Sequence, residues 1–262
     1  MRRYVIGDIH GCSKALRCLI EEIAPEKDDQ LIFLGDFIDR GPDSRGVIDQ
    51  LIELSSQTRV IPIRGNHEVM LMGVLVGGLD PQWWRQSGGQ STIASYGGSL
   101  DRIPDSHLDF FHSLRCHYET EREIFIHAGY DPLCPIERTC ELQRYWNHLT
   151  TWPAPHFSGK RVYVGHTPQA SGEVLNLGHL VCVDTYCFGG GWLTALNVDS
   201  HEALQASRQG HLRRTPAAAM LKWCKRLIAA TAQRCGGARK AEAVDRSLLP
   251  ASSATEKRYG HG

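Results

Sequence analysis

Residues 4–11 have the sequence Tyr-Val-Ile-Gly-Asp-Ile-His-Gly, in which a short apolar run ends at a glycine and an aspartate and a histidine follow. A run this short, rich in β-branched residues and bounded by turn residues, is typical of a buried strand. Four further stretches repeat the pattern. Their apolar runs are residues 31–34, 60–63, 124–126 and 162–164, and the polar blocks that follow them are Gly35–Gly41, Arg64–Glu68, His127–Gly129 and Gly165–Thr167.

The polar blocks are predicted to meet at one edge of a sheet. Glycine lets the backbone turn sharply at a strand exit and approach a ligand closely. In open α/β sheets, ligands bind in the crevice outside the carboxyl ends of the strands. Asp8 and His10, two residues apart in the first loop, can point at the same ion. Carboxylate, imidazole and amide groups without a cysteine suit Mn²⁺, Fe²⁺ or Zn²⁺ with positions open to water, whereas a thiolate zinc site does not fit.

Periodicity predicts the elements between and after these blocks. Apolar residues recur at helical spacing at 16, 19, 20 and 23 and again at 47, 48, 51 and 52, so a helix is expected after each of the first two blocks. After His166 the pattern changes to short extended runs over 173–177, 180–184 and 192–198, separated by glycine and asparagine, which indicates antiparallel hairpins.

The five blocks, in this order, resemble the phosphoprotein phosphatase branch of the calcineurin-like metallophosphoesterase superfamily, in particular the lambda-type and bacterial serine/threonine protein phosphatases. The likeness extends from about Tyr4 to about Val198. It includes a connecting segment and a last hairpin, which contain Trp84, Gly88, Gly89, Thr92 and residues 95–97, 183–185 and 191–194. The resemblance implies an α/β (α+β) fold in which two mixed β-sheets pack as a central sandwich flanked by helices.

A dinuclear metal centre is the second implication of the resemblance. Its six expected ligands are Asp8 and His10 for the first ion, Asp36 as the bridge, and Asn66, His127 and His166 for the second ion. Two ions about 3.5–4 Å apart clamp a phosphoryl oxygen and lower the pKa of a bridging water. We expect two divalent ions, Mn²⁺ in first place and Fe²⁺ or Zn²⁺ as alternatives.

The same resemblance implies the catalytic roles. His67 would protonate the leaving alkoxide, and Asp39, hydrogen-bonded to the other ring nitrogen of His67, would orient the ring and raise its pKa. Arg40 would hold phosphate oxygens bidentately, with Asn66 beside it. A hydroxide that bridges the ions would attack phosphorus directly, so no phosphoenzyme intermediate is expected.

One position departs from the lambda-type pattern. Where those enzymes have Trp-Asn-Arg, with the arginine contacting phosphate, this chain has Trp146-Asn147-His148. Histidine offers at most two donors and is only partly charged at neutral pH. Either Arg144 or Arg64 substitutes from nearby, or phosphate affinity is weaker and pH-dependent; Arg64 and His148 are therefore candidate phosphate contacts beside Arg40.

Two smaller questions also stay open. Asp184 either orients His166 or another ligand from behind, or is only a polar residue at the end of an apolar strand. Trp83 and Trp84 lie in a glycine-rich insert, and we expect them to pack that insert down rather than to form a platform beside the cleft.

Three functions fit these observations. The favoured one is a metal-dependent phosphomonoesterase acting on phosphoserine or phosphothreonine in a protein or peptide. The alternative is hydrolysis of dinucleoside polyphosphates, as in the related symmetrical tetraphosphatases. Those enzymes usually have alanine in place of Asp39 and aspartate in place of Glu68, so these two residues favour the first function. The third, a non-catalytic phosphate-binding protein, predicts a missing ligand, and every ligand is present.

Composition supports an ordinary globular enzyme. The chain has 262 residues, of which 42% are hydrophobic, and no apolar run reaches the roughly 18 residues of a membrane helix. Residues 1–6 enter a strand at once, which leaves no room for a signal peptide. Nine cysteines without regular spacing indicate free thiols in a reducing cytoplasm. We expect a monomer, and no motif supports nucleic-acid binding.

The zero net charge conceals an asymmetry. Residues 208–262 contain twelve Lys or Arg and three acidic residues, whereas residues 1–207 contain seventeen basic and twenty-six acidic residues. This split predicts a catalytic domain over 1–207 and a basic extension over 208–262. An apolar stripe predicts an amphipathic helix over about 216–234, which could dock on the acidic domain, our preferred interpretation, or on an anionic membrane or a partner. Beyond Gly236 the composition is typical of disorder.

Overall fold

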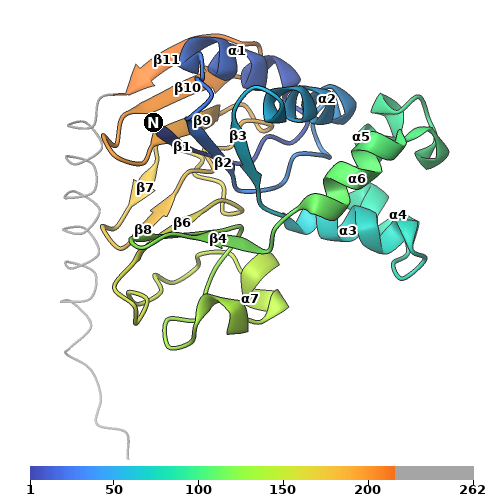
Figure 1. Ribbon diagram of the computed structural model, residues 1–262. Coiled ribbons are helices and arrows are strands. Elements are labelled where there is room, and N and C mark those ends of the chain that lie inside the picture. The colour runs from blue at the N-terminus through green and yellow to red at the C-terminus, as the bar shows by residue number, and fades with distance from the viewer. Residues whose placement is uncertain (216–262) are drawn as a thin grey trace, which may run out of the picture. The chain divides into compact units, whose positions relative to one another are not determined.

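The computed structural model describes residues 1–215 of the chain (Figure 1). They form two β-sheets with helices outside them. The amphipathic helix predicted over 216–234 and the disorder predicted beyond Gly236 lie outside the described residues.

The first sheet contains three parallel strands and three antiparallel ones, in the order β11-β10-β9-β1-β2-β3. The parallel strands are the first three apolar runs of the sequence, and they pair in register as β1 with β2 and β2 with β3. A hairpin from residues 192–207 continues this sheet, because β9 pairs antiparallel with β1 and with β10. The bounds are β1 (Arg3–Ile6), β2 (Gln30–Phe33), β3 (Arg59–Pro62), β9 (Trp192–Asn197), β10 (Ala203–Ser207) and β11 (Leu212–Thr215).

The second sheet has the order β4-β5-β6-β8-β7. Its centre, β5-β6-β8, is parallel, and both edges are antiparallel, so this sheet is also mixed. The bounds are β4 (His117–Glu119), β5 (Glu123–Ile126), β6 (Arg161–Val164), β7 (Leu175–Asn176) and β8 (Leu180–Cys182). The fourth and fifth apolar runs of the sequence are thus β5 and β6, and the runs after His166 form the predicted antiparallel pairs.

Alternation along the strands separates two hydrophobic cores. Val5 and Ile32 face the second sheet, where they pack in one cluster with Phe125, Tyr163 and Val181. Their sequence neighbours face the opposite way and pack with the helices, in a cluster that includes Tyr4, Ile6, Leu31, Phe33, Leu16, Leu19, Val47 and Leu51. Successive residues of a strand point to opposite faces, so one short apolar run supplies both cores. The predicted fold, two mixed sheets packed as a sandwich with helices outside, is confirmed.

Helices connect the strands and cover the sandwich. Figure 1 shows α1 and α2 on one side and α7 on the other. The apolar stripe predicted after the first block is the buried face of α1, and Asp43 caps the start of α2 by accepting a hydrogen bond from Gly46 N (2.9 Å). The bounds are α1 (Ser13–Ile23), α2 (Ser44–Ser55), α3 (Asn66–Leu75), α4 (Pro81–Trp84), η1 (Arg85–Gly89), α5 (Gln90–Ser95), η2 (Leu100–Arg102), α6 (Asp105–Ser113), η3 (Ile136–Arg138) and α7 (Glu141–Tyr145).

The predicted domain boundary at residue 207 lies too early. Strand β11 pairs with β10 through a short turn at Gly210, so residues 208–215 belong to the first sheet. The guanidinium of Arg213 donates to Gln205 Oε1 (2.7 Å) and Glu173 Oε1 (3.0 Å), and it lies over the ring of Trp192. The count of charged residues placed Arg213 in a basic extension. In the structure, its guanidinium pairs with groups of the folded domain.

No helix between residues 1 and 215 is both long enough and apolar enough to span a membrane.

Candidate metal centre

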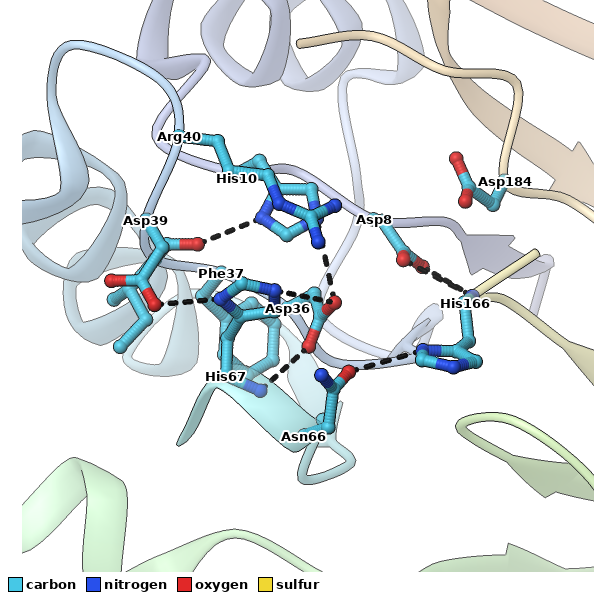
Figure 2. Close-up of polar contacts among 12 residues, drawn as sticks. Asp8, His10, Asp36, Phe37, Asp39, Arg40, Asn66, His67, His166 and Asp184 are labelled. Atoms are coloured by element: carbon cyan, nitrogen blue, oxygen red, sulfur yellow. Dashed lines mark hydrogen bonds and ion pairs between the residues drawn. The ribbon is translucent and has the colours of Figure 1, made fainter. Parts of the chain in front are cut away.

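The polar blocks converge at the ends of strands from both sheets. The loop after β1 carries Asp8 and His10, and the loop after β2 carries Asp36, Asp39 and Arg40. Asn66 and His67 are the first residues of α3, and the loops after β5 and β6 carry His127 and His166. Figure 2 shows Asp8, His10, Asp36, Asn66, His67 and His166 turned toward one another. The side chains of all these residues except Arg40 are buried.

Backbone strain is concentrated at this edge. Of the eight non-glycine residues with positive φ in the described part, five are His10, Asp36, Asp39, Arg40 and His166. Such conformations cost about 1–3 kcal/mol each and persist where the surroundings fix them. Glycine is required where these loops touch: a Cβ on Gly65 would collide with Asp36, and a Cβ on Gly165 would collide with the carboxylate of Asp8. The sequence pattern of glycine beside a ligand therefore reflects close packing between loops.

Asp36 is common to two groups of ligand atoms. His10, Asp36 and His67 form one group and Asp36, His127 and His166 the other, and within each group the ligand atoms lie within 4.8 Å of one another. Asp36 Oδ2 lies 3.4 Å from His10 Nε2, and Asp36 Oδ1 lies 3.5 Å from His127 Nε2. This is the position expected of a bridging carboxylate.

Asn66 and Asp8 complete the surroundings. The Oδ1 atom of Asn66 lies 3.0 Å from His127 Nε2 and 3.0 Å from His166 Nδ1, so Asn66 joins the second group. Both carboxylate oxygens of Asp8 accept from the backbone N–H of His166, at 3.1 Å. The first group thus contains His67 where Asp8 was expected, and Asp8 lies beside it, held by the loop after β6.

Each imidazole has one nitrogen engaged with an oxygen outside the centre. Nδ1 of His10 donates to Ile38 O (2.9 Å), Nδ1 of His127 donates to Leu34 O (2.7 Å), and Nε2 of His166 lies 3.2 Å from Trp146 O. In a neutral imidazole whose first nitrogen donates to a carbonyl, the second nitrogen has a free lone pair and can bind a metal ion. The remaining nitrogens of these three rings point toward Asp36 or Asn66.

The Asn66 amide faces the imidazoles of His127 and His166 and the carboxylate of Asp36. With its nitrogen inward, the amide would donate to both neighbouring imidazoles and to Asp36. With the amide oxygen inward, the oxygen faces only other acceptor atoms. Acceptor atoms that share no proton can all bind one cation through their lone pairs. The donor set, of imidazole nitrogen, carboxylate oxygen and one amide, fits a divalent ion.

The buried carboxylates leave the centre short of positive charge. Burial raises the pKa of Asp36, but the imidazoles of His127, His67, His10 and His166 outweigh burial and hold that pKa well below its usual range. Burial, with Asp184 and Asp36 nearby, raises the pKa of Asp8, and burial raises the pKa of Asp184 to about 7. Burial also lowers the pKa of His10 and of His127, and lowers that of His166 to about 3. Burial thus works against the protonated rings that would keep Asp36 ionised, and a bound cation would supply that positive charge in their place.

His67 and Asp39 form a buried hydrogen-bonded pair. His67 Nδ1 lies 2.6 Å from Asp39 Oδ2, and His67 Nε2 has no hydrogen-bond partner. Trp84 Nε1 (2.8 Å) and Thr92 Oγ1 (2.6 Å) also donate to the Asp39 carboxylate. Burial lowers the pKa of His67, but the carboxylates of Asp36 and Asp39 outweigh burial and raise it. A fixed imidazole with a raised pKa and a free nitrogen suits a proton donor.

Sequence reasoning missed the role of two residues around this pair. Trp84 was expected only to pack the glycine-rich insert; it is fully buried and also hydrogen-bonds Asp39. Glu68 accepts from the backbone N–H of Gly65, Asp36 and Phe37, so it fixes the loop after β2. Its position three residues after the N-cap Gly65, where a capping glutamate reaches back to free N–H groups, was the available signal.

Asp184 does not orient His166. Its carboxylate accepts from Tyr186 N (3.0 Å), and the outward nitrogen of His166 meets Trp146 O instead. Of the roles considered for Asp184, orientation of His166 is therefore excluded.

A cavity of about 320 Å³ lies beside the ligand groups. The residues that line it include Arg40, Asn66, His67, His148 and His166. Arg40 Nη1 lies 3.1 Å from His10 Nε2, and its guanidinium lies over the ring of Phe188 at 4.7 Å. The cavity therefore presents a guanidinium, an amide and the free nitrogen of His67 to one small anion. We refer to it below as the phosphate pocket.

The two alternative arginines lie elsewhere. Arg64 Nη2 donates to Leu114 O, and Arg144 Nη2 donates to Glu137 O and Thr139 O. Neither lines the phosphate pocket, whereas His148 does, with its ring stacked on His166 at 4.4 Å. Of the two candidate contacts besides Arg40, the structure brings His148 to the pocket and leaves Arg64 away from it.

Comparison with protein families agrees with this arrangement. The model of the calcineurin-like phosphoesterase family matches residues 1–199. The chain belongs to this family. As a calcineurin-like phosphoesterase it is a hydrolase that acts on phosphate esters, and the resemblance found in the sequence is confirmed.

Relatives within the family include two kinds of enzyme. A symmetrical bis(5'-nucleosyl)-tetraphosphatase of Legionella pneumophila (strain Lens) is 29% identical over 218 residues, which are 82% of this chain and 74% of the relative. Serine/threonine-protein phosphatase 1 of Salmonella typhimurium is 27% identical over 208 residues, 74% of this chain and 91% of the relative. A solved structure of a cold-active protein tyrosine phosphatase has a TM-score of 0.59 at 14% identity, covering 82% of this chain and 79% of that one; it supports the fold alone.

Proposed function

We propose that this phosphoesterase hydrolyses phosphate monoesters of alcohols, with phosphoserine or phosphothreonine in a protein or peptide as substrate. The observation that carries the proposal is the buried His67–Asp39 pair at 2.6 Å. An alkoxide is a strongly basic leaving group and needs a proton as the ester bond breaks. A nucleotide released from a polyphosphate is weakly basic and needs none. A proton donor whose partner carboxylate is itself fixed by hydrogen bonds from Trp84 and Thr92 therefore favours an alcohol as leaving group.

The residues would divide the work as follows. Arg40, His148 and Asn66 bind and orient the phosphoryl oxygens in the phosphate pocket. Nε2 of His67 carries the proton toward the leaving oxygen, while Asp39 keeps the ring oriented and stabilises its charge. Asp8, His10, Asp36, Asn66, His127 and His166 would hold two divalent ions. Such ions neutralise phosphoryl charge and lower the pKa of water, and Mn²⁺ remains our proposal for their identity.

The second candidate is the hydrolysis of dinucleoside polyphosphates. The comparisons support it better than they support a protein phosphatase, because the tetraphosphatase of Legionella pneumophila matches more of this chain, at slightly higher identity, than the Salmonella typhimurium protein phosphatase does. The acid pair supports the first candidate, as the sequence analysis also concluded from Asp39 and Glu68. Both candidates use the same metal centre, so they differ in the group attached to the phosphate.

A direct competition assay separates them. The purified, Mn²⁺-loaded protein is offered a phosphoserine peptide and diadenosine tetraphosphate side by side, and the kcat/KM values are compared. We expect the peptide to be preferred. Exclusive cleavage of the nucleotide would overturn the first candidate in favour of the second.

We also propose a cytoplasmic location for this protein. None of the seven cysteines in residues 1–215 forms a disulfide, which supports the reducing cytoplasm expected from the sequence. We keep the monomer as our proposal for the oligomeric state.

A further inference from the structure

A second cavity lies next to the phosphate pocket. Its volume is about 550 Å³, in the range typical of ligand sites. Trp146 and His148 line both cavities, so these two side chains are their common wall. A substrate anchored by its phosphate in the first cavity lies one side chain away from the second.

The lining of this second cavity carries no carboxylate, ammonium or guanidinium group. It comes from the loop after β5, from Gln143 of α7 and from the segment between α7 and β6. Tyr130, Leu149 and Pro153 give it apolar surface, and its exposed polar residues are Asn147, His148, Thr150 and Thr151. The hydroxyl of Tyr130 already donates to Ala154 O (2.8 Å), so Tyr130 offers mainly its ring. The cavity therefore suits an uncharged, largely apolar group.

Exposed apolar side chains surround the same segment. Of the nine large hydrophobic residues exposed in the described part of the chain, four lie between residues 133 and 157, namely Leu133 (84%), Leu142 (63%), Trp152 (45%) and Phe157 (60%). Leu133, Leu142 and Trp152 are each next in sequence to a residue that lines the cavity. Phe157 N donates to the backbone oxygen of Pro132, another lining residue (2.8 Å). This concentration of exposed apolar side chains next to lining residues favours an interaction site.

We propose that this cavity is a specificity subsite that binds an apolar residue next to the phosphorylated serine or threonine of a peptide substrate. The inference rests on the proposed function. A peptide fits better than a dinucleoside polyphosphate, because further phosphates leading out of the phosphate pocket would need lysine or arginine along their path. The lining of the second cavity offers neither.

Thr150 is the position that tests this subsite. Its side chain is exposed and lines the cavity, and its backbone N–H donates to His148 O, a bond that a substitution leaves in place. Thr150→Glu would add a carboxylate to an uncharged lining. Ser106→Glu is the matched control, because Ser106 is an exposed residue in the first turn of α6 and lines neither cavity.

The experiment measures kcat/KM for phosphoserine peptides that differ only in the residue after the phosphoserine, which is leucine, lysine or glutamate. An aryl phosphate serves as a substrate without peptide. We expect the wild type to prefer the leucine peptide by about tenfold, the effect of burying one apolar side chain. Thr150→Glu should lose that preference and favour the lysine peptide, and Ser106→Glu should keep the wild-type order. Trp152→Ala should reduce the leucine preference without favouring lysine.

The possible failures are distinguishable. If the wild type cleaves the aryl phosphate and all three peptides equally well, the subsite is wrong and the proposed function stands. An equal slowing of every substrate by Thr150→Glu would also overturn the subsite. If the wild type cleaves diadenosine tetraphosphate and no phosphopeptide, the proposed function fails and the subsite fails with it.

Discussion

The loop after β2 and the start of α3 border the same phosphate pocket as the segment between β5 and β6, but the two regions differ in how they are held. The loop after β2 and the start of α3 carry buried side chains, strained backbone and a carboxylate, that of Glu68, which several backbone N–H groups fix. The segment between β5 and β6 exposes large apolar side chains near an uncharged cavity. Rigid, buried polar groups suit chemistry, and an exposed apolar surface suits substrate selection. The comparison therefore assigns reaction and specificity to different parts of one site.

The largest effect is expected from Asp36→Asn, at the carboxylate shared by both ligand groups. The substitution keeps the shape but removes the charge that balances two cations. We expect a loss of bound metal and a fall in kcat/KM of roughly a thousandfold or more, since charge stabilisation by a metal contributes several kcal/mol. Metal analysis beside kinetics checks this. Full metal content with normal turnover would exclude Asp36 as the bridge.

His67→Asn should separate the substrates instead of abolishing activity. Without the proton donor, kcat for a phosphoserine peptide should fall by about 10²–10⁴-fold, whereas an activated aryl phosphate should lose far less. Metal content should remain at the wild-type level, because the prediction gives His67 no ligand role. Equal losses for both substrates would contradict the acid role and would agree with the placement of His67 among the ligand atoms of the first group.

Trp84→Phe tests the support behind the acid pair. It keeps a buried aromatic ring but removes one of the three hydrogen bonds that the Asp39 carboxylate receives from side chains. A bond to a charged group contributes about 1.5–3 kcal/mol, so we expect kcat for the phosphopeptide to fall by about tenfold or more. The aryl phosphate rate is the control. If both rates are unchanged, Trp84 only packs the insert, as the sequence analysis expected.

Chelation should lower stability as well as activity. Burial, and after it the charge of neighbouring carboxylates, raises the pKa values of Asp8 and Asp184, so bound cations would stabilise the ionised forms. A ligand present at 100 times its Kd stabilises a protein by about 2.7 kcal/mol, which corresponds to roughly 5–10 °C in Tm for a domain of this size. Thermal unfolding with EDTA and after addition of Mn²⁺ measures the difference. An unchanged Tm would mean that the centre binds no ion tightly.

The sequence predicted the strands and the converging residues because both are encoded locally. An apolar run, a glycine and a ligand are adjacent in the chain, as at Val5, Gly7 and Asp8, and parallel strands end at the same edge of a sheet. Contacts between distant segments were not predictable in this way. Trp84 and Thr92 reach Asp39 from 45 and 53 residues away, and nothing in their local pattern indicates that direction. The end of the domain was misplaced because a count of charges does not reveal that β11 pairs with β10.

The smallest effect on stability is expected from the ion pair between Arg2 and Asp29, which lies outside both regions. Its pH dependence reports acid unfolding of the whole domain and not events at the metal centre. Burial raises the pKa of Asp29, but hydrogen bonds from Arg2 and from Glu26 N outweigh burial and lower it to about 2. A carboxyl whose folded pKa lies below its unfolded value of about 3.9 stabilises the fold above that value, and this contribution is lost as pH falls toward 2. The Tm difference between wild type and Asp29→Asn should therefore be constant above about pH 5 and shrink below pH 4. A Tm difference that stays constant down to pH 2 would show that Arg2 does not lower the pKa of Asp29. A steeper fall in Tm that both proteins share would come from protonation of the metal ligands.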